Sequence, residues 1–232
     1  MFKYKIWFSL LISITIMLLT PSQKASATSF TTAGYRLNKN VKTMHEIKRE
    51  RIVSQSLDFS CGAAGLSTLL NYHLNDPTPE KEIIASLLQL VPLQKVKERR
   101  GFSMLDLKKY IESRGYKATG YTMDIEFLKS LNHPVLVPIK FKNYRHFVIV
   151  KEIIGDRVFF ADPAAGNMSM KADKFNRIWL KGIGLVIEDE NREDKKTALS
   201  INQADLRIAD YKAMKDVVNR SLVHTTIYPN EY

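Results

Sequence analysis

The chain has 232 residues, which is the length of one domain or two, and 45% of its residues are hydrophobic while 25% are charged. This composition is typical of a globular protein and excludes a disordered chain, a collagen-like repeat and a multi-span membrane protein. The formal net charge of +11 indicates a nucleic-acid or anionic partner only where the basic residues form a cluster. The single cysteine excludes an intramolecular disulfide.

Residues 1–27 have the pattern of a secretory signal. Lys3 and Lys5 form a basic head, residues 6–19 form an apolar run, and Ala25-Ser26-Ala27 is a small-residue exit. We expect cleavage after Ala27 and export through the inner membrane to a periplasmic or extracellular location. Cleavage would remove three lysines and no acid, which lowers the net charge from +11 to +8. The alternative is an uncleaved membrane anchor, although the run is shorter than the ~20 residues of a spanning helix.

Residues 28–50 are polar and basic, and we interpret them as a basic N-terminal arm or a lead-in strand. A helix is predicted from Cys61 onward, because apolar residues then recur at helical spacing. The recurring residues are Ala63, Leu66, Leu69, Leu70 and Leu74. An exported protein with a spare thiol must bury it or use it.

Two further helices are marked by their start signals. Thr78-Pro79-Glu80 combines a cap, a proline and an early acid, and it predicts a helix to about Leu90. The Ser103-x-x-Asp106 box predicts another helix, which Gly115 should end.

The second half of the chain is rich in predicted strands. Residues 135–139 form a short apolar run, residues 146–154 and 157–161 flank the turn Gly155-Asp156, and residues 182–188 form a last strand. The order of helices first and strands second predicts an α+β fold with an antiparallel sheet. We expect the main domain at residues 51–188, and a charged linker with a C-terminal helical extension at 189–232.

Cys61 opens the first predicted helix, where Asp58 and Ser60 mark the N-terminus. Unsatisfied backbone N–H groups and the helix dipole favour a negative charge there and stabilise a thiolate, the nucleophilic form of cysteine. The alternative is a buried core cysteine, the commonest position of a lone cysteine. Gln55 lies six residues upstream, and its amide could donate to a developing oxyanion beside the Cys61 N–H. A single glutamine in a loop is more often simply solvated.

A cysteine nucleophile needs a base, and His146 is the best placed of the five histidines. It begins an apolar strand, where it would be held rigidly and remain reachable. If residues 147–154 and 157–161 form a hairpin, Asp162 meets His146 across its open end and can fix the tautomer of the imidazole. Taken alone, His146 would be an ordinary strand-end residue, and Asp162-Pro163 an ordinary turn.

Together these motifs resemble the peptidase C39 family of papain-like cysteine proteases, best known as processing domains of peptide exporters. The motifs are Gln-x5-Cys-Gly-x-Ala at Gln55, the strand His-Phe-Val-Ile-Val at His146, and Asp162-Pro163 sixteen residues later. The segment Phe175-x3-Trp179 is similar to the family's closing segment. The resemblance implies a papain-like fold, a polypeptide substrate, and catalytic roles for Cys61 as nucleophile, His146 as base, Asp162 as its orienting partner and Gln55 as oxyanion donor.

The sequence departs from exporter-linked members in two ways. Ser60 precedes the cysteine where those members usually have aspartate, and the chain contains no Gly-x4-Gly-Lys-Ser/Thr phosphate loop. The family's substrate preference and its link to transport are therefore not carried over to this chain. A separate alternative function is a non-catalytic peptide-binding domain or an assembly factor for secreted or surface proteins. In that case the basic arm could dock on a secretion or surface-assembly partner, or it could be an ordinary solvated face.

Other ligand classes have little support in the sequence. We interpret residues 95–100 as a basic loop, and because it lacks interleaved aromatic residues we expect no nucleic-acid partner. One cysteine and scattered histidines give no metal-ligand spacing, so we expect no metal and no cofactor. A membrane partner is expected only if the signal is retained as an anchor.

Overall fold

The computed structural model describes residues 28–32, 35–39, 42–131, 133–141, 144–188, 197–202 and 205. The expected signal, residues 1–27, and nearly all of the expected C-terminal extension lie outside the described residues. The chain divides into two compact units, with the boundary between Thr43 and Met44. The smaller unit contains strands β1 (Thr28–Thr32) and β2 (Tyr35–Lys39), which pair antiparallel.

The larger unit contains seven helices among its described residues. They are α2 (Met44–Lys48), α3 (Cys61–Tyr72), α4 (Glu80–Leu90), α5 (Leu93–Arg99), α6 (Met104–Ser113), α7 (Ile125–Ser130) and α8 (Ala172–Ile178). Its strands are β3 (Lys117–Thr122), β4 (Val135–Phe141), β5 (Tyr144–Ile154), β6 (Arg157–Asp162), β7 (Gly166–Lys171) and β8 (Ile183–Glu188). The strands form one sheet in the order β3-β8-β4-β5-β6-β7, with antiparallel neighbours throughout.

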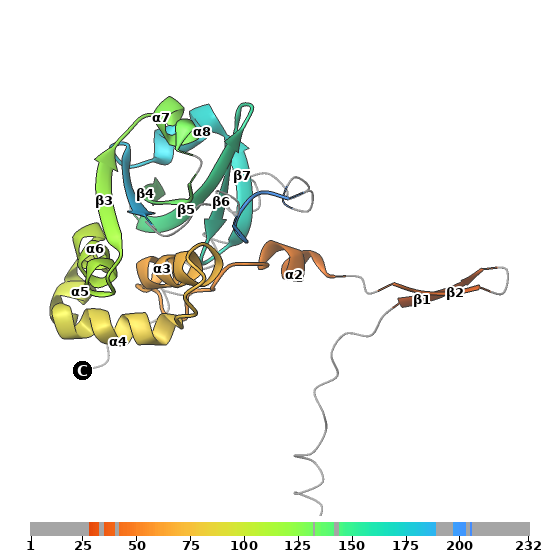
Figure 1. Cartoon of the computed structure of the whole chain (residues 1–232), viewed down its shortest axis with the longest axis horizontal. Helices are drawn as coiled ribbons and strands as arrows, with labels where there is room; N and C mark the ends of the chain where they lie inside the picture. Colours follow the sequence, from red (N-terminus) through yellow and green to blue (C-terminus); the bar gives the residue numbers. More distant parts are fainter. Residues whose placement is uncertain are drawn as a thin grey trace, which may run out of the picture. The chain divides into compact units, whose positions relative to one another are not determined.

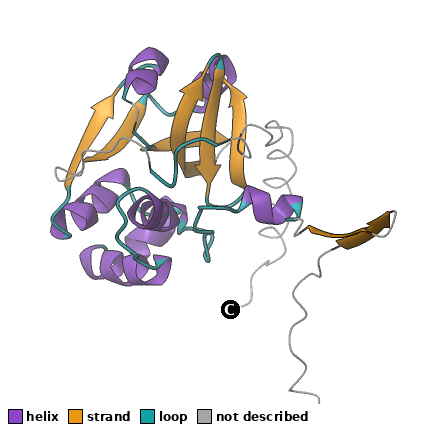
Figure 2. Ribbon diagram, turned by 45° about the vertical axis from the view of Figure 1, so that its right-hand side comes forward, coloured by secondary structure: helices purple, strands orange, loops and turns teal. Residues whose placement is uncertain are grey.

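Two hydrophobic cores hold this unit together. The first lies between helices α3 to α6 and the sheet, and it includes Leu66 and Leu107 from the helices with Leu136 and Ile149 from the strands. The second contains strand residues of opposite parity, such as Val148, and residues of α7 and α8. In Figures 1 and 2, α3 to α6 gather on one side of the larger unit, and α7 and α8 lie at the other. Alternating side chains of each central strand therefore serve two separate cores.

The predicted α+β class is confirmed, with N-terminal helices packed on a C-terminal antiparallel sheet. The helices expected from Cys61, near Thr78 and at Ser103 are all present. Ser103 and Asp106 form the reciprocal capping box. At the second helix the cap is Pro79, with no side-chain cap bond, and the helix begins at Glu80.

The interpretation of residues 95–100 as a loop is wrong. Residues 93–99 form helix α5, which follows Pro92 and ends at Arg100, a residue in the left-handed region with φ of 58°. Val96 is the one fully buried side chain of this helix, so its apolar periodicity is too weak to recognise. Strands β3 and β7 and helices α7 and α8 also lie outside the elements that the sequence predicts.

The segment after β8 returns to the larger unit. Leu199 is fully buried in the first core, and Arg51 donates to the carbonyl oxygens of Ala198 and Ser200. Asp205 forms ion pairs with Arg51 at 2.6 Å and with the buried Lys151 at 3.0 Å. Packed structure therefore continues past residue 188, where the main domain was expected to end.

In the part of the chain that the structure describes, no helix combines the length and the apolar character needed to cross a membrane.

Candidate active site

Cys61 is the first residue of α3, and its side chain is buried, with 4% of the residue exposed. The small residues after it allow close packing against the neighbouring layers. A Cβ on Gly62 would lie 2.8 Å from a methyl group of Leu107, and one on Gly65 would lie 2.7 Å from Leu136 Cδ1. Helix α3 therefore packs so closely against α6 and β4 that the position of Cys61 is fixed.

Ser60 is the N-cap residue of α3, but its side chain does not cap the helix. Its hydroxyl instead donates to the carbonyl of Leu57 at 2.8 Å and accepts from the Leu57 N–H at 3.0 Å. The hydroxyl thereby closes the turn that leads into the helix. The first-turn N–H groups, which an N-cap side chain usually satisfies, receive no bond from Ser60.

His146 and Asp162 meet as the sequence predicts. Ile149 pairs with Ala161 in the β5–β6 hairpin, so His146 and Asp162 lie together on the other face. His146 Nε2 lies 2.7 Å from Asp162 Oδ1, and both side chains are buried. The other ring nitrogen, Nδ1, is buried and has no hydrogen-bond partner of ordinary geometry among the described residues, although the Cys61 thiol interacts with the imidazole.

The charges around His146 and Asp162 favour an ion pair. Burial disfavours the imidazolium, but Coulombic interactions and hydrogen bonding with Asp162, and to a lesser extent with Cys61, outweigh it and hold the pKa of His146 well above its ordinary value. Burial likewise works against the carboxylate, yet His146 and the N–H groups of Ala164 and Ala165 hold the pKa of Asp162 below its ordinary value. Helix α3 packs on β5 at this level, because a Cβ on Gly62 would lie 3.3 Å from Phe147 Cδ2; the residues that follow Cys61 and His146 in the chain are therefore neighbours.

Tyr144 connects strand β5 to the loop that precedes α3, and the sequence patterns did not identify it. Its hydroxyl donates to the carbonyl of Asp58 at 2.9 Å, and its ring stacks on that of His146 with centroids 5.8 Å apart. Burial raises the pKa of Tyr144, and the charges of Cys61, Asp58 and Asp162 raise it further. The pattern that would have found it is its parity, since a residue two before His146 shares its strand face.

Gln55 is tied to the same region through its backbone. Its N–H donates to the carbonyl of Pro163 at 3.0 Å, directly beside Asp162. Its side-chain nitrogen donates to the carbonyl of Leu57 at 3.1 Å, while the buried Oε1 has no partner among the described residues. A flipped amide would set two oxygens against each other, so this orientation is the favoured one. No hydrogen bond joins Gln55 to Cys61 among the described residues.

The candidate site combines a buried thiol at a helix start, a histidine–aspartate pair, and a glutamine in the loop that precedes α3. Within the described ranges, no group of three or more His, Cys, Asp or Glu side chains is arranged to hold a metal ion. The buried thiol and the histidine–aspartate pair are suited to acid–base and nucleophilic chemistry carried by side chains.

Comparison with known proteins adds independent findings. The model of the peptidase C39 family matches residues 49–192. Two relatives are each named probable functional amyloid protease FapD. The one from Pseudomonas aeruginosa is 35% identical over 146 residues, which are 63% of this chain and 64% of the relative. The one from Pseudomonas fluorescens is 35% identical over 166 residues, which are 72% of each chain. The match thus spans slightly less than two thirds of the first relative's length.

A solved structure with a similar fold is the peptidase domain of Streptococcus ComA, described as a bi-functional ABC transporter involved in a quorum sensing pathway. It is 20% identical, with a TM-score of 0.50, over 60% of this chain and 98% of that one. This likeness concerns the fold, and it agrees with the predicted papain-like α+β class.

Proposed function

The chain belongs to the peptidase C39 family, and from this premise we propose that it hydrolyses peptide bonds with Cys61 as the nucleophile. The observation that carries the proposal is the buried His146–Asp162 pair, 2.7 Å between Nε2 and Oδ1, coupled electrostatically to Cys61. A base that is itself oriented by a third group is the general signature of an activated nucleophile.

The proposed reaction has two steps. Cys61 Sγ, as the thiolate, attacks the carbonyl carbon of the substrate, and the C–N bond then breaks as the imidazolium of His146 gives its proton to the leaving amine. In the second step His146 takes a proton from water, whose oxygen attacks the thioester. The carboxylic acid leaves, and the thiolate of Cys61 is restored.

Asp162 and Gln55 support these steps in different ways. Asp162 accepts from Nε2 and so directs Nδ1, the unbonded nitrogen, toward the reaction. Gln55 carries a second amide hydrogen besides the one bonded to Leu57, and we assign it to the oxyanion together with the backbone N–H of Cys61. Each such donor contributes a factor of about 100 to 1,000 in rate.

The substrate we propose is an exported polypeptide of a secretion or surface-assembly system. The names of the two Pseudomonas relatives, probable functional amyloid proteases, support a fibre-forming substrate. The signal-like pattern of residues 1–27 supports a reaction on the outer side of the inner membrane. N-terminal sequencing of the exported protein, with Thr28 expected at the new terminus after cleavage behind Ala27, tests this location.

The activity is tested by incubating the protein with a peptide library prepared from a digested proteome and identifying new termini by mass spectrometry. We expect cleavage by the wild type and none by Cys61→Ala, with the fold retained. Iodoacetamide should alkylate the single cysteine rapidly at neutral pH and abolish cleavage.

A matched pair of histidine variants controls for non-specific effects. His146→Gln should lose at least 100-fold in rate, the lower range for a general acid–base group, whereas His133→Gln, at an exposed position, should cleave at the wild-type rate. Cleavage that persists in Cys61→Ala would refute the proposal. Binding of peptides without any cleavage by the wild type would favour the non-catalytic alternative.

A further inference from the structure

Glu80 is a buried acid whose partner is a backbone amide next to Gln55. It is the first residue of α4 and is 6% exposed. Both of its carboxylate oxygens accept from the N–H of Ser56, at 3.0 and 3.1 Å. No cation lies within ion-pair distance of this carboxylate in the described part of the chain. Glutamate is rarely buried without a partner, so the bond to Ser56 accounts for its position.

The loop that carries Gln55 is thereby anchored at two successive amides. The N–H of Gln55 donates to Pro163 at the end of the hairpin, and the next N–H, that of Ser56, donates to Glu80 on α4. These bonds run to different layers of the fold, so together they determine the position and direction of the backbone from which the Gln55 side chain leaves.

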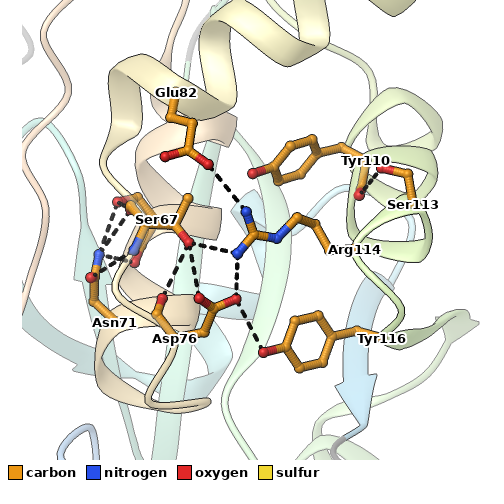
Figure 3. Close-up of polar contacts among 9 residues, drawn as sticks. Ser67, Asn71, Asp76, Glu82, Tyr110, Ser113, Arg114 and Tyr116 are labelled. Carbon is orange, nitrogen blue, oxygen red and sulfur yellow. Dashed lines mark hydrogen bonds and ion pairs between the residues drawn. The ribbon is translucent and has the colours of Figure 1, made fainter.

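The start of α4 is itself fixed to the helix that carries Cys61. Figure 3 shows the polar cluster that does this. Ser67 Oγ donates to the carbonyl of Thr78 at 2.6 Å, and the Thr78 N–H donates to Asn71 Oδ1 at 3.1 Å. Both partners lie on α3. Arg114, which follows α6, bonds Asp76 at 2.6 Å and Thr78 Oγ1 at 3.2 Å. Glu80 therefore belongs to the same rigid frame as the thiol.

We propose that Glu80 is a positioning residue for Gln55. Glu80 holds the Ser56 amide, so that the Gln55 side chain lies where the oxyanion forms. This inference rests on the proposed peptidase function. A shift of a catalytic donor by about 1 Å can cost about 100-fold in rate, and one bond to a buried carboxylate is enough to prevent or permit such a shift in a short loop.

The test is a double-mutant cycle on kcat with the best substrate from the peptide library. Glu80→Ala should lower kcat about 10- to 100-fold and change KM by less than about threefold, because the lost interaction acts mainly in the transition state. In the Gln55→Ala background the same substitution should cost less than about threefold. Residues that act through one another give such non-additive losses.

Two variants and one chemical probe separate positioning from a merely structural role. Glu80→Gln keeps an acceptor for the Ser56 N–H and should stay within about threefold of the wild type. Glu112→Ala changes an exposed acid on α6 whose carboxylate pairs with Lys108 on the same helix, away from the cluster that fixes α4, and it should keep the wild-type kcat. The rate of alkylation of Cys61 by iodoacetamide should be the same in Glu80→Ala as in the wild type.

Independent, multiplicative losses from Glu80→Ala and Gln55→Ala would overturn the inference, and so would slowed alkylation of Cys61 in the Glu80 variant. If the alanine variant does not fold, Glu80→Met keeps the length of the side chain without a strong acceptor and gives the same comparison. A wild-type protein with no Cys61-dependent cleavage would instead refute the proposed function, so the two failures are distinguishable.

Discussion

Replacing Asp162 by alanine or by asparagine should separate the structural and chemical roles of this carboxylate. Its Oδ1 accepts three hydrogen bonds, from His146 Nε2 at 2.7 Å, from the N–H of Ala164 at 2.8 Å and from the N–H of Ala165 at 3.1 Å. Asp162→Ala removes all three. At about 1 kcal/mol for each of the two backbone bonds and about 1.5–3 kcal/mol for the bond to a charged ring, the loss is about 3.5–5 kcal/mol in the free energy of unfolding.

Asp162→Asn keeps an oxygen acceptor in the same place and loses only the charge. We expect it to cost about 1–2 kcal/mol, which is the difference between a charged and a neutral hydrogen bond. It also keeps the imidazole oriented, because the amide oxygen still accepts from Nε2–H. Cleavage should therefore fall by about 10-fold in the asparagine variant and by about 100-fold or more in the alanine variant.

Urea denaturation followed by circular dichroism gives the two unfolding free energies, and cleavage of a library-derived peptide gives the two rates. Asp173→Asn, which changes an aspartate on an exposed turn of α8, is the matched control and should resemble the wild type in both assays. If asparagine and alanine at position 162 destabilise the protein equally, the three bonds to Oδ1 do not contribute as argued.

Three other predictions concern the site and its supports. His146→Ala should slow cleavage more than Asp162→Ala, since the proton carrier contributes more than its orienting partner; a reversed order in steady-state rates would contradict the roles assigned. Gly65→Val should lower the free energy of unfolding, measured by urea denaturation, by about 1–3 kcal/mol, because even a Cβ there lies 2.7 Å from the fully buried Leu136. An unchanged urea midpoint would show that helix α3 can move away from the sheet. Burial raises the pKa of Asp205, but the charge of Lys151 and the hydrogen bonds that Asp205 accepts lower this pKa overall. The stability that Asp205 adds is therefore complete above pH ~4 and is lost as the pH falls further. A free energy of unfolding that is still higher in the wild type than in Asp205→Asn at pH 2 would contradict this reasoning.

The elements that the sequence predicts are those with a local signal. The helix at Cys61 has a strong apolar period, Ser103 has its capping partner three residues away, and Gly155 marks the hairpin turn. Because the hairpin has a short turn, it also places His146 beside Asp162, and the central pair of the candidate site could be predicted before the structure.

The parts that could not be predicted depend on contacts between distant residues. Glu80 accepts a hydrogen bond from an amide 24 positions earlier, whereas the sequence predicts only an ordinary acidic residue in the first turn of a helix. Asp205 pairs with Arg51, 154 positions away, whereas the sequence places it only near the start of the expected C-terminal helical extension. Lys151 lies at the irregularity between Val150 and Glu152 in β5. The change of register there leaves the lysine side chain buried, which the simple alternation of a regular strand does not predict.

The hydroxyl of Ser60, committed to the Leu57 turn, leaves α3 with an open end. A serine in this position usually stabilises its helix by about 1 kcal/mol through a bond to the first turn, and here that contribution is given up. The backbone dipoles at this end consequently point at the sulfur without a built-in counterpart. In the proposed reaction, the tetrahedral intermediate formed when Cys61 attacks a carbonyl would carry a negatively charged oxygen near these N–H groups. They would donate to it, so the end of α3 that Ser60 leaves uncapped would be capped while the intermediate exists.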